Sequence, residues 1–306
     1  MKIAIIGRTE QLYDTALRLN TAGHKIVCIV TAKEAPEYNR TSSDFRVLAE
    51  TWQIPFVQGG RISGHADFLQ KQQADIAVSI NYTGVVPQSV IDLFPLGVLN
   101  AHGGDLPRYR GNACQAWAII NGEDRIGLCI HKMIGGELDS GDIIARDYLL
   151  IDYATKVTQV LEWMNSRTPV LLSEAVDILG ANPDFFLERQ SKDPKDALRC
   201  YPRRPDDGRI DWHKPALSIL RLINASNKPY AGAFCDYEGD KLIIWDAELV
   251  NDDEFFCAVP GQVTKIGEGF IEVACGDGKL RILEIEIKEK SIKPSELIKS
   301  IRMRLV

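Results

Sequence analysis

The first 150 residues alternate short apolar runs with amphipathic stretches, and this alternation restricts the fold more than any other feature of the sequence. Four runs rich in Val and Ile predict buried strands, at 2–6, 25–30, 74–80 and 96–100. Four stretches with helical spacing lie between or after them, at 9–22, 44–53, 63–73 and 86–93. Strands that alternate with helices are joined by right-handed crossovers into a parallel sheet. We therefore predict an α/β fold with a doubly wound, Rossmann-like, mostly parallel sheet.

The second half of the chain follows a different pattern. Two more strands are expected at 126–133 and 143–151, followed by a long helix at 155–179 that Pro169 could break. Further helices are expected near 212–226 and 294–302, and turn dipeptides at Glu238-Gly239, Glu268-Gly269 and Asp277-Gly278 predict hairpins. We thus expect three parts: a first domain at 1–185, a connector at 186–208, and a smaller antiparallel, β-barrel-like (OB-like) domain at 209–306.

Composition excludes several classes of protein. The net charge of −6 argues against a protein that coats nucleic acid or an anionic membrane. No apolar run is long enough to span a bilayer, and the first residues lack the regions of a signal peptide, so a cytoplasmic location is expected. Seven cysteines without a C-x-x-C pair favour reduced thiols and no metal site.

Polar residues gather where buried strands end. Asn100 ends the strand at 96–100 and His102 follows it, and alternate residues of an extended chain point to the same side. Ligands of open parallel sheets bind at the carboxyl ends of strands, although a single histidine there is as often a structural hydrogen bonder. Gly7 alone follows the first strand, so the glycine pattern of a dinucleotide site is absent. The segment "GGELDSGDII" contributes Asp139, which by itself is typical of a turn.

Taken together, "NAHGGDLPRYRG" and "GLCIHKM…LDSGDI" resemble the N10-formyltetrahydrofolate-dependent formyltransferases, and "RRPDDGRIDWHKPA", "NKPYAGAF" and "PGQV" resemble the second domain of the longer members. The resemblance implies a formyltransferase catalytic domain at 1–185, N10-formyltetrahydrofolate as co-substrate and no metal. It places the catalytic functions on Asn100, His102 and Asp139. A histidine exchanges protons near neutrality, and an amide donates a hydrogen bond to a developing oxyanion.

The same resemblance implies that folate binds largely to backbone, at 80–87 and 133–139. The residues expected to contact it are Tyr82, Gly84, Val85, Val86, Met133, Gly135, Gly136, Leu138 and Asp142. Glycines there permit close approach of the chain to a ligand.

The acceptor of the formyl group is the least constrained feature. Residues 207–306 hold 14 Lys and Arg against 17 Asp and Glu, so no basic surface for RNA is expected. The H-G-G variant of the loop is similar to the nucleotide-sugar N-formyltransferases. We therefore predict a UDP- or dTDP-linked 3- or 4-amino deoxysugar as acceptor, for surface polysaccharide or lipopolysaccharide synthesis, with no nucleic acid or membrane partner. Residues expected to bind it are Gly104, Arg110, Arg203, Arg204 and Tyr230.

Three alternatives stay open at this point. The chain is also similar to methionyl-tRNA formyltransferase, and a formyltetrahydrofolate hydrolase or a non-catalytic folate-binding protein would share much of the pattern. Related sugar enzymes imply that the protein is a homodimer.

Overall fold

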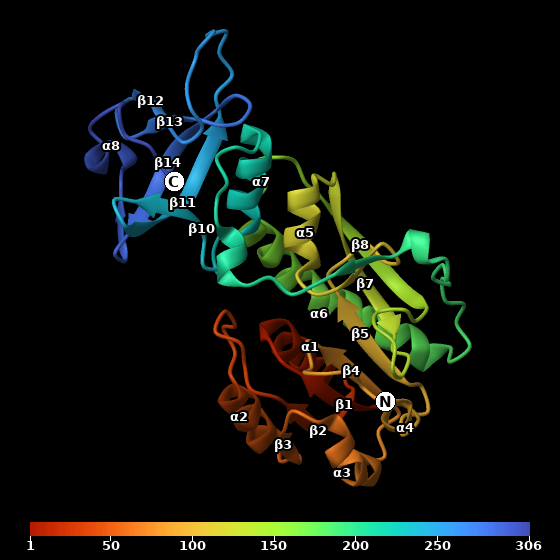
Figure 1. The fold of residues 1–306 in the computed structure, drawn as a ribbon. Helices are drawn as coiled ribbons and strands as arrows, with labels where there is room; N and C mark the ends of the chain where they lie inside the picture. The colour runs from red at the N-terminus through yellow and green to blue at the C-terminus, as the bar shows by residue number, and fades with distance from the viewer. The chain divides into compact units, whose positions relative to one another are not determined.

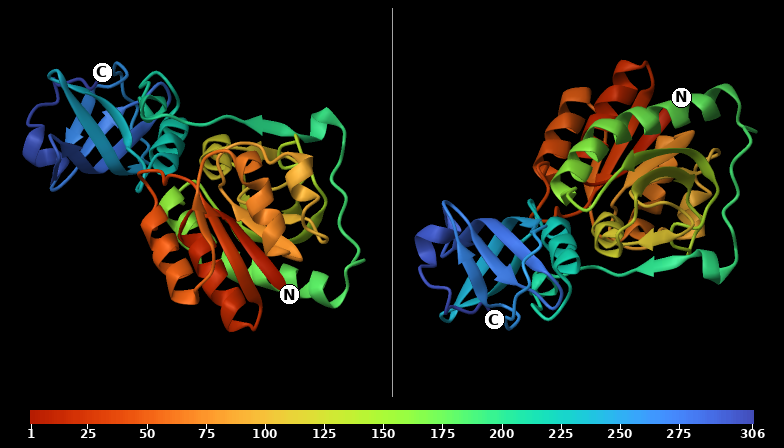
Figure 2. Two further views of the ribbon diagram at one scale, coloured as in Figure 1. Left: turned by 90° about the horizontal axis from the view of Figure 1, so that it is seen from below. Right: turned by 90° about the horizontal axis from the view of Figure 1, so that it is seen from above.

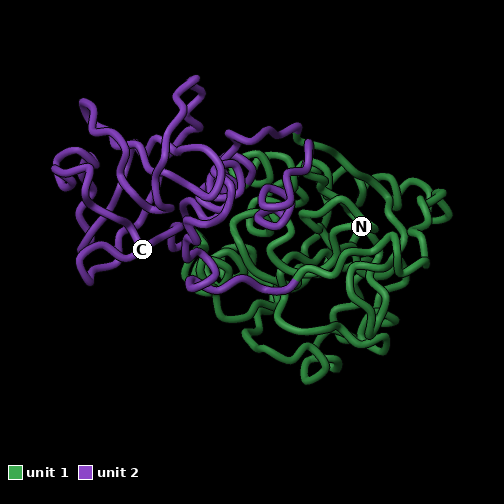
Figure 3. Tube along the Cα trace, turned by 45° about the horizontal axis from the view of Figure 1, so that its top comes forward, with its two compact units in different colours: residues 1–114, 126–149, 161–200 green, residues 115–125, 150–160, 201–306 purple.

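A computed structural model describes all residues from 1 to 306. The chain forms two compact units, coloured separately in Figure 3. The N-terminal unit comprises Met1–Cys114, Ile126–Leu149 and Leu161–Cys200, and the C-terminal unit comprises Gln115–Arg125, Leu150–Val160 and Tyr201–Val306. The limits 1–185, 186–208 and 209–306 drawn from sequence stay a prediction.

A seven-stranded sheet forms the centre of the N-terminal unit, in the order β3-β2-β1-β4-β5-β7-β8 (Figure 1). Its strands are β1 (Lys2–Gly7), β2 (Lys25–Thr31), β3 (Phe56–Gln58), β4 (Ile76–Ile80), β5 (Val98–His102), β7 (Arg125–Lys132) and β8 (Ile143–Leu150). The first five strands pair in parallel, and β7 runs antiparallel to β5. The predicted doubly wound, mostly parallel sheet is therefore confirmed.

Helices cover both faces of this sheet. They are α1 (Glu10–Thr21), α2 (Ser42–Trp52), α3 (Ala66–Gln72), α4 (Gln88–Ile91) and most of α6 (Val157–Ala181), with a 3-10 turn at Ile62–His65. On one face, Leu69 of α3 and Val90 of α4 pack against Ala4, Val30 and Val98. On the other, α1 contacts α2 and α6, and Figure 2 shows α6, in green, crossing the sheet. Burial on both sides explains why the central strands are continuous apolar runs.

Three elements differ from expectation for physical reasons. Strand β5 continues through His102, so this residue belongs to the strand instead of following it. Helix α6 does not break at Pro169, because Leu171 and Leu172 beyond it are buried and hold the helix in place. The last helix, α8 (Pro294–Leu297), is shorter than predicted, since Ile298 takes an extended conformation that buries its side chain in the core.

The C-terminal unit is built on an antiparallel sheet in the order β10-β11-β14-β13-β12, with β15 paired to β14. Its strands are β10 (Ala233–Tyr237), β11 (Asp240–Leu249), β12 (Val263–Ile266), β13 (Ile271–Ala274), β14 (Lys279–Ile287) and β15 (Lys290–Ile292). The predicted hairpins join β10 to β11, β12 to β13 and β13 to β14. Helix α7 (Ala216–Ala225) packs Ile219 and Ile223 onto this sheet. Helix α5 (Cys114–Asn121) belongs to this unit from Gln115 onward.

The segment after α6 is extended and pairs with other strands of the N-terminal unit, to which it belongs (Figure 2). Strand β9 (Leu198–Cys200) runs parallel to β6 (Tyr109–Gly111) as a two-stranded sheet. Farther back, Glu188 forms an isolated antiparallel bridge with Ile143 at the start of β8. Two 3-10 turns, at Pro194–Asp196 and Pro205–Gly208, flank β9. This segment is thus bonded to the chain that follows β5, which no sequence pattern indicated.

Candidate functional site

Asn100 is oriented by a histidine on the neighbouring strand. Because β5 and β7 are antiparallel, Asn100 lies opposite His131, and Nδ2 of Asn100 is 3.1 Å from Nε2 of His131. Nδ1 of His131 donates to the carbonyl of Lys132 at 3.0 Å, and in that tautomer Nε2 accepts from the Asn100 amide. His131 is buried, and this pairing fixes which way the Asn100 amide points.

His102 lies between a carbonyl and a carboxylate. Its Nε2 donates to the backbone oxygen of Tyr109 at 2.7 Å, and its Nδ1 is 3.6 Å from Oδ2 of Asp139. Burial lowers the pKa of His102, while the charge of Asp139 opposes that effect. The neutral imidazole therefore has its proton on Nε2 and an unprotonated Nδ1 facing the carboxylate, where an added proton gains a charge partner.

Asp139 occupies the centre of this group. Its backbone is left-handed, with φ 49°, and the turn directs the carboxylate toward the end of β5. Oδ2 accepts the backbone N–H of Gly111 at 2.9 Å, and Oδ1 is 3.6 Å from Nε2 of His131. Burial by itself would raise the pKa of Asp139, but the positive charges that His102 and His131 carry when protonated, together with the Gly111 N–H, lower it to about 2. The carboxylate is therefore ionised throughout the neutral range.

The structure thus brings Asn100, His102 and Asp139 into one cluster, although the last two are 37 positions apart in the sequence. Sequence reasoning missed His131, whose signal was available: it stands on the strand predicted at 126–133, next to the strand end that holds Asn100. It also missed Gln190, which donates to the backbone oxygens of Asp139 and Gly141. No local pattern marks Gln190, because it lies in an irregular segment 51 residues after Asp139.

The two segments expected to bind folate lie against each other. The backbone N–H of Gly135 donates to Oε1 of Gln88 at 2.8 Å, which joins the loop after β7 to the first residue of α4, directly after the segment 80–87. Of the nine residues, Val86 is fully buried, and Tyr82 and Met133 pack against the same core. Val85 and Leu138 are exposed, Gly84 and Gly136 are left-handed with open space around them, and the Asp142 carbonyl accepts from Lys132.

The residues expected to bind the acceptor are divided between the units. Gly104 and Arg110 belong to the N-terminal unit, whereas Arg203, Arg204 and Tyr230 belong to the other. Arg110 donates to Gln190 at 2.7 Å. The guanidinium of Arg203 donates to Ser226 and to the backbone of Asp207, while the Arg204 side chain is exposed.

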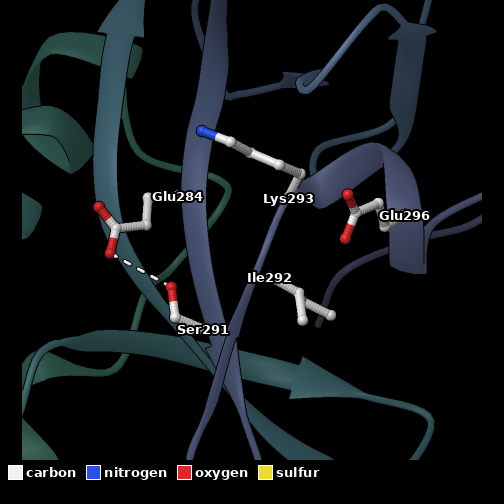
Figure 4. Close-up of a pocket in the computed structure, with 5 residues that line it drawn as sticks. All are labelled: Glu284, Ser291, Ile292, Lys293 and Glu296. Carbon is white, nitrogen blue, oxygen red and sulfur yellow. Dashed lines mark hydrogen bonds between the residues drawn. The ribbon is translucent and has the colours of Figure 1, made fainter.

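One hollow, of about 250 Å³, lies in the C-terminal unit between β14, β15 and α8 (Figure 4). It is lined by Glu284, Ser291, Ile292, Lys293 and Glu296, none of which was predicted to bind a ligand.

Nowhere in residues 1–306 do three His, Cys, Asp or Glu side chains gather as metal ligands would. No helix combines the length and apolar character needed to cross a bilayer.

Comparison with known proteins identifies the family. The sequence profile of the formyl transferase domain matches residues 1–176, and that of the formyl transferase C-terminal domain matches residues 203–302. The chain belongs to the formyltransferase family. It is a formyl-transferring enzyme, as the resemblance implied, and the clustered Asn, His and Asp lie within the first matched region.

Two curated relatives match this formyltransferase over nearly its full length. A methionyl-tRNA formyltransferase of Citrifermentans bemidjiense is 29% identical over 96% of this chain and 92% of its own. One of Geotalea uraniireducens is 29% identical over 95% of this chain and 91% of its own.

Solved structures share the fold at lower identity. The N-formyltransferase of Helicobacter canadensis, in complex with folinic acid and dTDP-3-aminofucose, has a TM-score of 0.70 and 16% identity, covering 92% of this chain and 99% of its own. HypX of Aquifex aeolicus, in complex with tetrahydrofolic acid, has a TM-score of 0.60 and 17% identity. It covers 98% of this chain, which spans only 47% of the HypX chain.

These comparisons overturn the predicted acceptor. The prediction of a nucleotide-sugar N-formyltransferase for polysaccharide synthesis is wrong. The two relatives that match nearly the whole chain in sequence are named methionyl-tRNA formyltransferase, which was the alternative. Sugar enzymes resemble the chain only in fold, at 16–18% identity. The physical reason for the error lies in Gly104 and Arg203. A Cβ on Gly104 would lie 2.6 Å from Nε2 of His102, and Arg203 is bonded to Ser226 of its own unit, so each residue has a structural role that does not depend on the acceptor.

Proposed function

We propose that this formyltransferase transfers the formyl group of N10-formyltetrahydrofolate to the α-amino group of methionyl-tRNA. The observation that supports methionyl-tRNA as the acceptor is the 29% identity with a methionyl-tRNA formyltransferase over 96% of the chain. The cluster of Asn100, His102 and Asp139 supports the chemistry, since acyl transfer to an amine needs a proton acceptor, an oxyanion donor and a proton for the leaving nitrogen.

The folate would be held by the loops that follow β4 and β7. Gly84 and Gly136 have left-handed backbones with no atom close to where a Cβ would stand, so a flat ring can approach the chain there. When bound, the formyl-folate supplies an activated one-carbon unit whose carbonyl carbon accepts a nucleophile.

His102 would act on protons. Its unprotonated Nδ1 takes the proton that the amine loses, and the adjacent Asp139 carboxylate stabilises the resulting imidazolium. Protonated His102 then returns that proton to the departing folate nitrogen, so one residue serves as base and acid. Positioned proton transfer of this kind is worth about 10²–10⁴-fold in rate.

Asn100 would stabilise the negative charge that develops on the formyl oxygen. One N–H of its amide is bonded to His131, and the other has no protein partner, so it can donate to that oxygen. Loss of one such donor costs about 3–4 kcal/mol of transition-state stabilisation in known enzymes.

The test is an absorbance assay of tetrahydrofolate release with purified protein and N10-formyltetrahydrofolate. Methionyl-tRNA is the expected acceptor, and uncharged tRNA, free methionine and UDP- or dTDP-amino sugars complete the panel. Release only with methionyl-tRNA supports the proposal. Release without any acceptor would identify a hydrolase, and release only with an amino sugar would overturn the tRNA proposal.

Two histidine variants test the chemistry separately. His102→Ala should reduce release by at least about 10²-fold. His24→Gln is the matched control, because His24 pairs with Asp177 at 2.8 Å elsewhere in the same unit and should keep wild-type turnover. Unchanged turnover in His102→Ala would contradict the proposed mechanism whatever the acceptor.

The charge of the chain adds a quantitative expectation for the acceptor complex. With an excess of three acidic residues in 207–306, the protein has few cations to spare for phosphates. The logarithm of affinity should fall with the logarithm of salt concentration with a slope near −0.7 for each phosphate of a single-stranded end. We expect a slope of roughly −2 to −3, corresponding to about three or four phosphate contacts.

A further inference from the structure

Gln190 is a buried amide whose hydrogen-bonding groups are all used at the candidate site. Its Nε2 donates to the backbone oxygen of Asp139 at 2.9 Å and to that of Gly141 at 2.6 Å. Its Oε1 accepts from Nη2 of Arg110 at 2.7 Å. Only 7% of the residue is exposed, so water does not substitute for these partners easily.

The position of Gln190 follows from strand register. Glu188 and Ile143 exchange backbone hydrogen bonds at 2.8 and 2.9 Å as an antiparallel pair. In an antiparallel pair, two residues onward on one chain lie opposite two residues back on the other, which sets Gln190 beside Gly141. Gly141 itself has no room for a side chain, since a Cβ would lie 1.7 Å from the Lys132 oxygen.

The chemistry of these contacts selects glutamine. Two carbonyl oxygens on one side require two N–H donors, and the guanidinium on the other side requires an acceptor. A glutamate at this position would meet the Arg110 cation but would turn an oxygen toward the two carbonyls. Methionine has a similar volume and can make none of the three bonds.

We propose that Gln190 is a positioning residue for formyl transfer: by holding the backbone of Asp139 and Gly141, it keeps the Asp139 carboxylate at His102 and Gly111. The proposal rests on the proposed roles of Asp139 and His102. Asp139 has a left-handed backbone, so its turn needs external support, and the support comes from a segment beyond the matched region of the first domain. Arg110 acts in turn by fixing the orientation of the Gln190 amide.

A purely structural role would be to fasten the segment that follows α6. Glu188 provides the matched control, because it pairs with Arg146 in the same segment and does not contact the candidate site. Glu188→Gln removes the ion pair but keeps the backbone bridge to Ile143. If fastening alone matters, Gln190→Met and Glu188→Gln should have similar effects.

The experiment compares Gln190→Met, Gln190→Glu and Glu188→Gln with the wild type by steady-state kinetics between pH 5 and pH 9, after thermal unfolding has shown that each is folded. We expect both Gln190 variants to lose about 10²-fold in kcat, the cost of a misplacement near 1 Å, with the KM for formyl-folate within about threefold. The acidic limb of the kcat–pH profile should move to lower pH. The displaced Asp139 carboxylate stabilises the protonated form of His102 less, so the pKa of His102 falls. Glu188→Gln should keep the wild-type kcat and the wild-type acidic limb of the kcat–pH profile.

Two results would overturn the proposal. One is a wild-type kcat in Gln190→Met together with an acidic limb of the kcat–pH profile at the wild-type pH. The other is an equal loss of kcat in Glu188→Gln, which would mean that Gln190 only holds the segment after α6 in place. If His102→Ala keeps full activity, the proposed catalytic cluster fails instead, so the two failures can be told apart.

Discussion

Replacing Asp139 by asparagine tests the electrostatics of the candidate site most directly. The substitution keeps the shape of the side chain, and Oδ1 of asparagine can still accept the Gly111 N–H. It removes the charge that faces Nδ1 of His102 and Nε2 of His131, both at 3.6 Å. Stability and activity should therefore change for the same reason.

The pKa of Asp139 gives the size of the stability effect. Folding lowers it from 3.8 to about 2, and the side chain is 12% exposed, so solvent screening is limited. Each pKa unit corresponds to about 1.4 kcal/mol, so the ionised carboxylate contributes roughly 2 kcal/mol at pH 7. Because the folded pKa is the lower one, this contribution exists above pH 4 and disappears as the pH falls toward 2. About half of it should be left at pH 3.

The assay is urea unfolding of wild type and Asp139→Asn followed by circular dichroism, from pH 7 to pH 3. The variant should be less stable by roughly 2 kcal/mol at pH 7, and the difference should narrow below pH 4. In the formyl-transfer assay, kcat at pH 7 should fall by roughly 10²–10⁴-fold. Equal stability at pH 7, a difference independent of pH, or a wild-type kcat would refute the electrostatic account of Asp139.

Two further substitutions test the surroundings of the cluster. In Gly104→Ala, a Cβ 2.6 Å from Nε2 of His102 should displace the imidazole and lower kcat about 10²-fold, while Gly64→Ala, which has open space, should leave it unchanged. In His131→Phe, loss of the acceptor for the Asn100 amide should lower kcat about 10-fold with little change in KM, measured by steady-state kinetics; an unchanged kcat would remove His131 from the site.

The architecture was predictable because its signals are local. Burial on both faces of β1, β2 and β4 makes each strand a continuous apolar run, and such runs can be recognised without knowledge of their partners. The hairpin at Glu238-Gly239 is likewise local, since both residues adopt positive φ, as the turn requires. Short elements such as β3 were missed, because three residues hold too little pattern.

The site was predictable in part for a different reason. Asn100 and His102 share one strand, so their proximity could be predicted from the sequence. Asp139 was found only through the family pattern, because its spacing from His102 in the sequence does not indicate that the two residues lie close together. His131 requires knowledge that β7 pairs with β5 and in which register. Gln190 requires the register of an isolated bridge, a contact that leaves no periodic trace in sequence. Predictability therefore falls as a residue's position depends on pairings between distant segments.

The error about the acceptor follows from the same principle. The H-G-G variant of the loop suggests a sugar acceptor, yet in this structure a Cβ on Gly104 would lie 2.4 Å from the Tyr109 oxygen and 2.6 Å from the His102 ring, so local packing also favours glycine there. Packing against the His102 imidazole is a requirement of the loop itself and does not depend on which amine is formylated. Net charge was a weak guide to the acceptor, because a count over 100 residues limits how many phosphates can be bound but does not exclude a few cations near an RNA end. We expect acceptor choice to depend on residues farther from His102, so that substitutions there change the KM for the acceptor while leaving kcat and its pH profile intact.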